Sequence, residues 1–149
     1  MSLTNLLLDS WDRQCNCIRS LATLIDEELA QVKPSEDGWS LSRQLCHIHN
    51  TRVYWLSMAS GKEDDNLASL FHQEGEEWVA STDLTLIREE LEKSARSIRD
   101  WLQSHLDHDG PAGAYDHPLF FLQHMVWHEG WHAGLIMLGL RLAGHEPPE

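Results

Sequence analysis

The sequence HMVWHEGWH, residues 124–132, is the most informative stretch of the chain. Its three histidines, His124, His128 and His132, stand four positions apart. Residues at this spacing lie one above the other on the same face of an α-helix. The run therefore predicts a helix on which His128 and His132 hold one metal ion between them.

The helix around this run extends in both directions. It opens near Asp116 with Pro118 in its first turn, and it continues through Leu142 to a stop at Gly144. Residues at seven-position intervals have the spacing of a buried seam: Phe121, His128, Leu135 and Leu142. We therefore expect His128 to lie in line with core residues. His132 lies one turn further on, in a row of its own with Met125 and Gly139, two residues that leave room.

Three further segments repeat their apolar residues with a helical period, about Leu3 to Val32, Ser40 to Ala59 and Leu84 to His105. Ser40 is placed to cap the second helix and Gly61 to end it, and Thr82 or Asp83 caps the third. No stretch alternates with period two for long enough to predict a strand. The chain is therefore expected to be all-α.

Residues 61–81 are polar and acidic and have no clear period. We expect a long connection here, with one short helix at most, and its length favours a role in covering a site. Four helices with this connection between the second and the third predict a four-helix bundle. A chain of 149 residues fits one such domain over residues 1–149.

The charge of the chain limits its partners. The sequence contains 24 acidic and 11 basic residues, a net charge of −13 with neutral histidines. This charge would repel a phosphate backbone and anionic lipids, so neither nucleic acid nor a membrane is expected as a partner. The start of the chain lacks the basic region of a secretory signal, and no apolar run approaches the roughly 20 residues of a membrane span. These features predict a cytoplasmic protein.

The three cysteines agree with a reducing compartment. Cys15, Cys17 and Cys46 are odd in number, and a Cys-x-Cys pair on a helix directs its sulfurs to nearly opposite sides. Buried free thiols are the favoured interpretation. A reactive thiol at Cys46, which is next to His47, is the alternative.

Residues 128–132 also match the zincin pattern His-Glu-x-x-His, in which the glutamate is the general base. A zincin takes its third ligand downstream, whereas only 17 residues follow His132 and the extended glycine and histidine of metzincins are absent. A zincin-like peptidase is therefore the less favoured alternative.

The third ligand is then expected from the second helix, which offers His47 and His49. The position of each histidine around the helix does not choose between them. Imidazoles buried among leucines and tryptophans cost free energy unless each ring nitrogen finds a partner. A single buried histidine usually finds a backbone carbonyl, but a His-x-x-x-His pair on an apolar helix favours a divalent metal.

Two motifs, in this order, resemble the DinB/YfiT-like superfamily. The first is GWSLSRQLCHI at residues 38–48, and the second is HMVWHEGWHAGLI at residues 124–136, followed by LRLAG at 140–144. The helix count fits the full length of the chain. The resemblance implies a four-helix bundle that holds nickel or zinc.

Residue by residue, the resemblance implies that the metal ligands are His47, His128 and His132. His49 then becomes a neighbour of the site or a surface residue. The family often continues the histidine pair as His-x-Gly-Gln-Ile, whereas Leu135 stands here in the position of the glutamine. An amide that could have hydrogen-bonded near the site is therefore missing.

Three neutral histidines leave a divalent metal with open positions, which is typical of catalytic sites. Such a metal could activate water for hydrolysis or bind the thiolate of a low-molecular-weight thiol. We therefore expect a metal-dependent hydrolase or thiol-dependent transferase that acts on a small molecule. The alternative is a non-catalytic metal-binding or sensing bundle. In either case we expect a homodimer.

Other residues near the motifs have candidate roles. Glu129 is the nearest candidate base, although it lies about 100° around the helix from His128, and a solvated surface carboxylate is the simpler interpretation. His124 either reaches the pocket as a proton shuttle or packs beside His128. Trp131 is one of four tryptophans near the motifs, and aromatic walls suit a pocket for an apolar small molecule.

Overall fold

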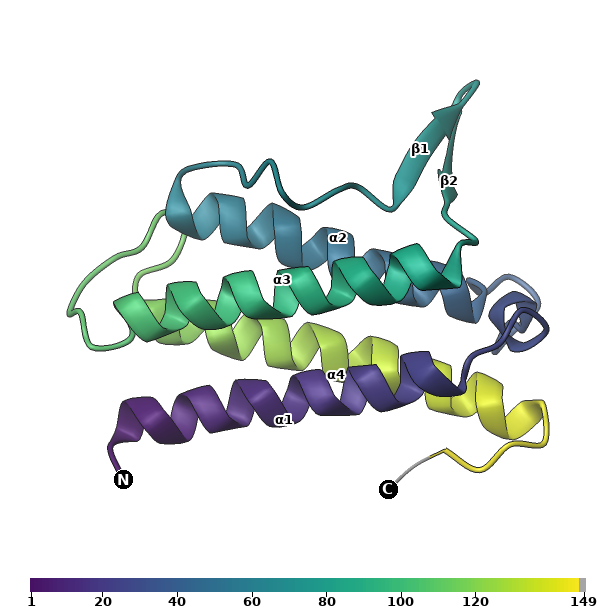
Figure 1. Ribbon diagram of the computed structural model, residues 1–149, viewed down its shortest axis with the longest axis horizontal. Helices are drawn as coiled ribbons and strands as arrows, with labels where there is room; N and C mark the ends of the chain where they lie inside the picture. Colours follow the sequence, from purple (N-terminus) through teal and green to yellow (C-terminus); the bar gives the residue numbers. More distant parts are fainter. Residues whose placement is uncertain (148–149) are drawn as a thin grey trace.

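Within the described residues, 1–147, the computed structural model contains four long α-helices that lie side by side (Figure 1): α1 (Leu3–Leu24), α2 (Leu41–Ser60), α3 (Leu84–His105) and α4 (Pro118–Leu142). Both α1 and α2 pack against α3 and α4. The prediction of a mainly helical chain is confirmed. None of the helices in this part of the chain has both the length and the apolar character that a membrane span requires.

The ends of the helices follow local sequence signals. The Ser40 hydroxyl accepts the backbone N–H of Arg43 at the start of α2, and the Asp83 carboxylate accepts that of Leu86 at the start of α3. Gly61 ends α2 in the left-handed conformation with φ 75°, which glycine adopts at low cost. The predicted bounds of α2 and α3 are therefore confirmed.

The first helix is shorter than predicted. α1 ends before Ile25, whose backbone is extended, and a separate 3₁₀ turn, η1 (Leu29–Gln31), follows it. The Asp26 carboxylate accepts the N–H of Leu29 at 2.9 Å and starts this turn. Arg88 of α3 donates to the Ile25 carbonyl at 2.7 Å and so satisfies the end of α1. Because Ile25 and Leu29 are both buried, the apolar period continues past the break and hides it.

The connection between α2 and α3 contains a hairpin, where the sequence predicted no strand. Strands β1 (Phe71–Glu74) and β2 (Glu77–Ala80) pair antiparallel, with Phe71 opposite Ala80. Gly75 in the turn has φ 63°. The hairpin projects from the helices (Figure 1). Four residues per strand, mostly exposed, are too few to produce a recognisable alternation, so the all-α expectation is wrong at this point.

The buried side of α4 differs from the predicted seam. Phe121 is buried, but Leu135 is only half-buried and Leu142 is 65% exposed. The buried row lies one step around the helix and includes Met125, Glu129, His132, Ile136 and Gly139. A Cβ atom on Gly139 would lie 2.6 Å from the side chain of Leu41 in α2. Glycine at this position therefore lets the two helices that carry the histidines approach closely.

The cysteines are free thiols. Cys15 and Cys46 are buried, as predicted, whereas Cys17 is exposed. Burial raises the pKa of the Cys46 thiol to about 12, and the thiol donates to the Ser81 carbonyl. A thiol in this state is a poor nucleophile at neutral pH, which argues against a reactive Cys46.

Candidate metal centre

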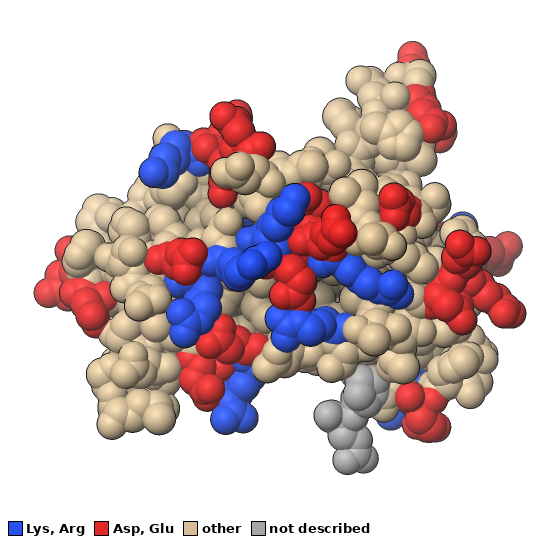
Figure 2. Space-filling view, viewed as in Figure 1, with Lys and Arg blue, Asp and Glu red and all other residues tan. Residues whose placement is uncertain are grey.

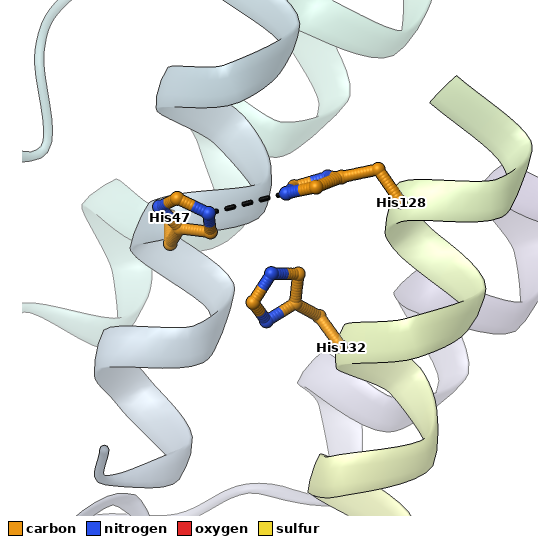
Figure 3. Close-up of side chains that lie close together, drawn as sticks. All are labelled: His47, His128 and His132. Carbon is orange, nitrogen blue, oxygen red and sulfur yellow. Dashed lines mark hydrogen bonds between the residues drawn. The ribbon is translucent and has the colours of Figure 1, made fainter. Parts of the chain in front are cut away.

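Three histidines from two helices point toward one another (Figure 3): His47 on α2, and His128 and His132 on α4. One ring nitrogen from each lies within 4.8 Å of the others. The Nε2 atoms of His47 and His128 are 3.1 Å apart. The structure thus brings together the three residues expected as ligands, in an arrangement that could hold a metal ion.

The environment keeps these imidazoles neutral. Burial, together with the neighbouring His132 and His47, lowers the pKa of His128 to about 3. Burial and the nearby His47 lower the pKa of His132 to about 4. Burial and the Arg43 guanidinium lower the pKa of His47 as well. All three rings therefore offer lone pairs at neutral pH, which a metal requires.

One of the rings is oriented by an amide from the other helix. The Nδ1 atom of His132 is hydrogen-bonded to Oε1 of the buried Gln44. Because an amide oxygen only accepts, Nδ1 must carry the proton and Nε2 keeps its lone pair. Gln44 was not among the predicted site residues, although its position one turn before His47 on α2 was a usable signal. Position 135, where the family often has a glutamine, is a leucine here. Gln44 therefore supplies an amide near the site from the other helix.

The rings of His47 and His128 have weaker or fewer hydrogen bonds to side chains of the protein than the ring of His132. The Thr51 hydroxyl lies 3.4 Å from Nε2 of His47. Nδ1 of His128 is buried and has no hydrogen-bond partner within the part of the chain described. Buried polar atoms without a partner are rare and costly in folded proteins. The nitrogen of His128 that faces His47 is Nε2, so a metal held there would not pair with Nδ1, and the ring of His128 is less fully hydrogen-bonded than that of His132.

A groove opens beside the cluster. Its volume is about 350 Å³, and its walls include Trp39, Gln44, Trp131, His132, Leu135 and Leu138. The Trp39 ring stacks over His132 at 6.1 Å and meets His47 edge-on at 4.9 Å. Trp131, predicted as a pocket residue, lines this groove and is 62% exposed. The site thus has an apolar, aromatic approach.

The start of the long connection covers a different hollow. Residues 60–67 line a space of about 540 Å³ against α2 and α3, and no histidine lines it. The later part of the connection lies nearer the site, because Arg43 donates to the Trp78 carbonyl of β2 at 3.3 Å. If part of the long connection covers the histidine site, as predicted, that part is the hairpin and not residues 60–67.

His49 lies outside the cluster. It is fully buried, so the surface interpretation is wrong. Its Nδ1 atom is 3.1 Å from the Ser94 hydroxyl, and its Nε2 atom is 2.7 Å from the Ala68 carbonyl. Both ring nitrogens are used in joining α2 to α3 and the connection. Of the two candidates on α2, His47 is the one that faces α4.

His124 packs near the site but does not join it. Its Nδ1 atom is 2.7 Å from the Tyr115 hydroxyl, and its ring meets Trp55 edge-on at 4.8 Å. Its effect on the cluster is electrostatic, since it is among the neighbours that lower the pKa of His128. The role of proton shuttle stays a prediction.

Glu129 is fully buried, so its interpretation as a solvated surface carboxylate is wrong. Arg52 of α2 donates to both carboxylate oxygens through Nε and Nη2. The Gln14 amide of α1 lies 3.5 Å from one of these oxygens. Arg52 also donates to the Leu91 carbonyl at 2.9 Å. The carboxylate expected as a base is thus held in a buried ion pair with Arg52, which was not predicted.

These observations define a helical protein whose α2 and α4 carry a three-histidine site that could bind a metal ion. The chain belongs to the DinB family, whose model matches residues 1–149. A DinB-like protein from Bacillus cereus has a similar fold, with a TM-score of 0.73 and 21% sequence identity over 96% of this chain and 94% of that one. No curated protein matches the chain. The predicted family is therefore confirmed.

Proposed function

We propose that this protein is a metal-dependent enzyme that acts on a small molecule, either by hydrolysis or by transfer involving a low-molecular-weight thiol. The observation that carries the proposal is the convergence of three neutral imidazoles from the two helices at the side of an aromatic groove. The four helices are the bundle that presents this site.

The donor set fits a divalent metal, with nickel or zinc as the proposed ion. Neutral imidazole nitrogens suit both metals, and one ring nitrogen from each of the three histidines lies within 4.8 Å of the others, which supports this choice. Three protein ligands leave room for another molecule, as in catalytic zinc sites. When bound, the ion would supply Lewis acidity that lowers the pKa of a water or a thiol and polarises a substrate carbonyl.

The residues of the chain have separate tasks in this proposal. Gln44 holds the His132 ring in the tautomer that leaves Nε2 free. Trp39 covers His47 and His132 and limits access of water from that side. Trp131 and Leu138 form apolar walls of the groove, which favour an apolar or aromatic substrate portion.

Peptidase chemistry of the zincin type is not proposed. The third candidate ligand, His47, comes from α2 and not from the residues after His132. Glu129, the base of the zincin pattern, is buried against Arg52. Both of its carboxylate oxygens accept hydrogen bonds from Arg52, so the side chain is directed into the interior and not toward the histidine cluster.

The proposal is tested by the accessibility of the metal to added ligands. Protein without a histidine tag is stripped, loaded with Co²⁺ as a spectroscopic probe, and titrated with azide and with a small thiol. A change in the visible spectrum is expected, because a water or thiol must reach the ion. A screen of esters, amides and thiol conjugates follows with Ni²⁺- and Zn²⁺-loaded protein, and activity absent from His128→Ala is expected.

A non-catalytic metal-binding or sensing role is the second candidate. It is favoured by the burial of Glu129 in its ion pair with Arg52, because the carboxylate next to His128 in the sequence then points away from the groove. The same titration separates the two candidates. A spectrum unchanged by azide and thiol indicates a closed coordination sphere and rejects the enzyme proposal in favour of this one.

A further inference from the structure

The outward face of α4 is apolar, although no other part of residues 1–147 covers it. Five large side chains on this helix are between 47% and 69% exposed: Phe120, Trp127, Trp131, Leu138 and Leu142. Their spacings of seven, four, seven and four residues place them along one stripe, as at a helix–helix seam. A helix that is apolar all round is normally buried on all sides. We call these five residues the α4 stripe.

The α4 stripe carries no charge. The charged residues of α4 are Glu129, which is buried, and Arg141, which lies in the last turn beyond most of the stripe. The face formed over α1 and α3 is different, because acidic and basic side chains are crowded on it (Figure 2). A chain with a net charge of −13 repels its own copies over most of its surface. The stripe is a face where two copies can meet without that repulsion.

The stripe is large enough to matter for association. With about 150–250 Å² for each aromatic side chain, its exposed part comes to roughly 600 Å². A standard interface buries about 800 Å² on each partner, so the stripe and its immediate rim reach that size. Apolar patches of several hundred Å² on a protein surface usually mark an interaction site.

Two glycines make the stripe complementary to itself. Gly130 and Gly134 are exposed between and beside the two tryptophans, and a Cβ atom on either would meet nothing within 4 Å. If two α4 helices cross antiparallel here, Trp127 of each lies over Gly134 of the other, and Trp131 lies over Gly130. Both contacts then repeat by two-fold symmetry, as a dimer interface of one surface with itself requires.

We propose that a second copy of this chain docks on the α4 stripe, antiparallel, with tryptophans set against glycines. A second copy is favoured over a different protein because the pattern of large and small residues matches its own reverse and because the stripe is uncharged. Trp131 and Leu138 belong both to the stripe and to the groove beside His132. The α4 helix of the partner therefore forms an outer wall of the groove.

The mass of the protein in solution tests the docking. Sedimentation equilibrium of the wild type is expected to give twice the chain mass of 17.1 kDa. Trp127→Glu is expected to give the single-chain mass. The matched control is Trp78→Glu on the hairpin, which makes the same change at a side chain that is 59% exposed and should leave the dimer intact. A monomeric wild type, or equal masses for the two variants, overturns the proposal.

A second variant avoids the question of misfolding. Gly134→Glu adds a side chain where the single chain has open space, and glutamate favours helix more than glycine does, so the monomer should unfold at the same or a higher temperature. The Gly134→Glu protein is expected to be monomeric, because the added side chain would occupy the space in which Trp127 of the second copy packs. A Gly134→Glu protein that is folded and still dimeric overturns the proposal.

Disulfide formation tests the antiparallel arrangement. The two copies of position 130 lie next to the two-fold axis, so Gly130→Cys in a Cys17→Ser background should oxidise to a covalent dimer. Trp78→Cys in the same background is the control and should not. A Gly130→Cys protein that dimerises without cross-linking overturns the antiparallel arrangement.

Discussion

Two polar clusters lie between α2 and α4, and they are built in opposite ways. In the first, Arg52 and Glu129 neutralise each other, and their remaining donors and acceptors are used by neighbouring groups. In the second, His47, His128 and His132 are all neutral, and one buried nitrogen has no partner in the described residues. The first cluster pairs opposite charges, whereas the second gathers neutral rings whose lone pairs could bind a metal ion.

The contrast separates a structural role from a functional one. Glu129 directly follows His128 in the sequence, but successive helical residues point about 100° apart. Glu129 therefore meets Arg52 in the interior, while His128 meets His47. The ion pair of Arg52 and Glu129 is expected to contribute to the stability of the fold. The three neutral imidazoles have lone pairs that could bind a metal cation. The two clusters should therefore respond differently to substitution and to pH.

The ion pair is expected to dominate stability. Glu129→Gln leaves the fully buried Arg52 without its counter-charge and should lower the free energy of unfolding by about 3–5 kcal/mol. Urea unfolding of the metal-free protein measures this. The double variant Arg52→Met/Glu129→Leu should recover most of the loss, because it removes both charges. If Glu129→Gln is as stable as the wild type, the first cluster is not structural.

The histidine cluster is expected to dominate metal binding. His47→Ala, His128→Ala and His132→Ala should each weaken Ni²⁺ or Zn²⁺ binding by at least about 100-fold, the upper end of what loss of an orienting partner costs. Calorimetric titration and elemental analysis measure this effect.

His49→Ala is the matched control for His47→Ala. It should keep the metal but lose about 1–3 kcal/mol of stability, because Ser94 and the Ala68 carbonyl lose their partner. Retained metal in His47→Ala together with lost metal in His49→Ala would show that the other histidine of α2 is the ligand.

Substitution of Gln44 should weaken metal binding by the three histidines less than loss of one of the histidines does. Gln44→Leu removes the acceptor that fixes the His132 tautomer and is expected to weaken metal binding by about 10–100-fold. The control is Gln14→Leu, which removes the amide beside Glu129 and should leave metal affinity unchanged. Equal affinities for these two variants would mean that Gln44 only fills space.

The smallest expected effect is the pH dependence of the metal-free protein. The unfolded chain protonates these histidines near pH 6.5, whereas the folded pKa values are about 3 for His128 and about 4 for His132. The unfolded state therefore binds more protons between these limits, so stability is complete above about pH 6.5 and falls as the pH falls.

Urea midpoints of wild type and His128→Leu at about pH 7.5 and about pH 5 test this sign. The variant lacks the ring with the most depressed pKa, so its midpoint should fall less between the two pH values. Parallel losses in both proteins would show that carboxylates, and not this ring, cause the pH dependence.

Local signals allowed much of the fold to be predicted. Ser40, Asp83 and Gly61 act within one turn of their own position, so the bounds of α2 and α3 could be expected from neighbouring residues alone. The histidine pair on α4 is also local, because helix geometry places residues four apart on one face. By contrast, the end of α1 depends on Asp26 and on Arg88 of a distant helix, and the short hairpin has no distinctive period.

Neighbouring residues in the sequence were enough to predict four helices with the bounds of α2 and α3, the spacing of His128 and His132 on one helix face, and the family. Only the tertiary structure decided that His47 and not His49 faces that pair, that Gln44 orients His132, and that Glu129 is paired with Arg52. The physical reason is that helical periodicity sets which residues share a face. Which neighbour a face meets depends on how the helices pack.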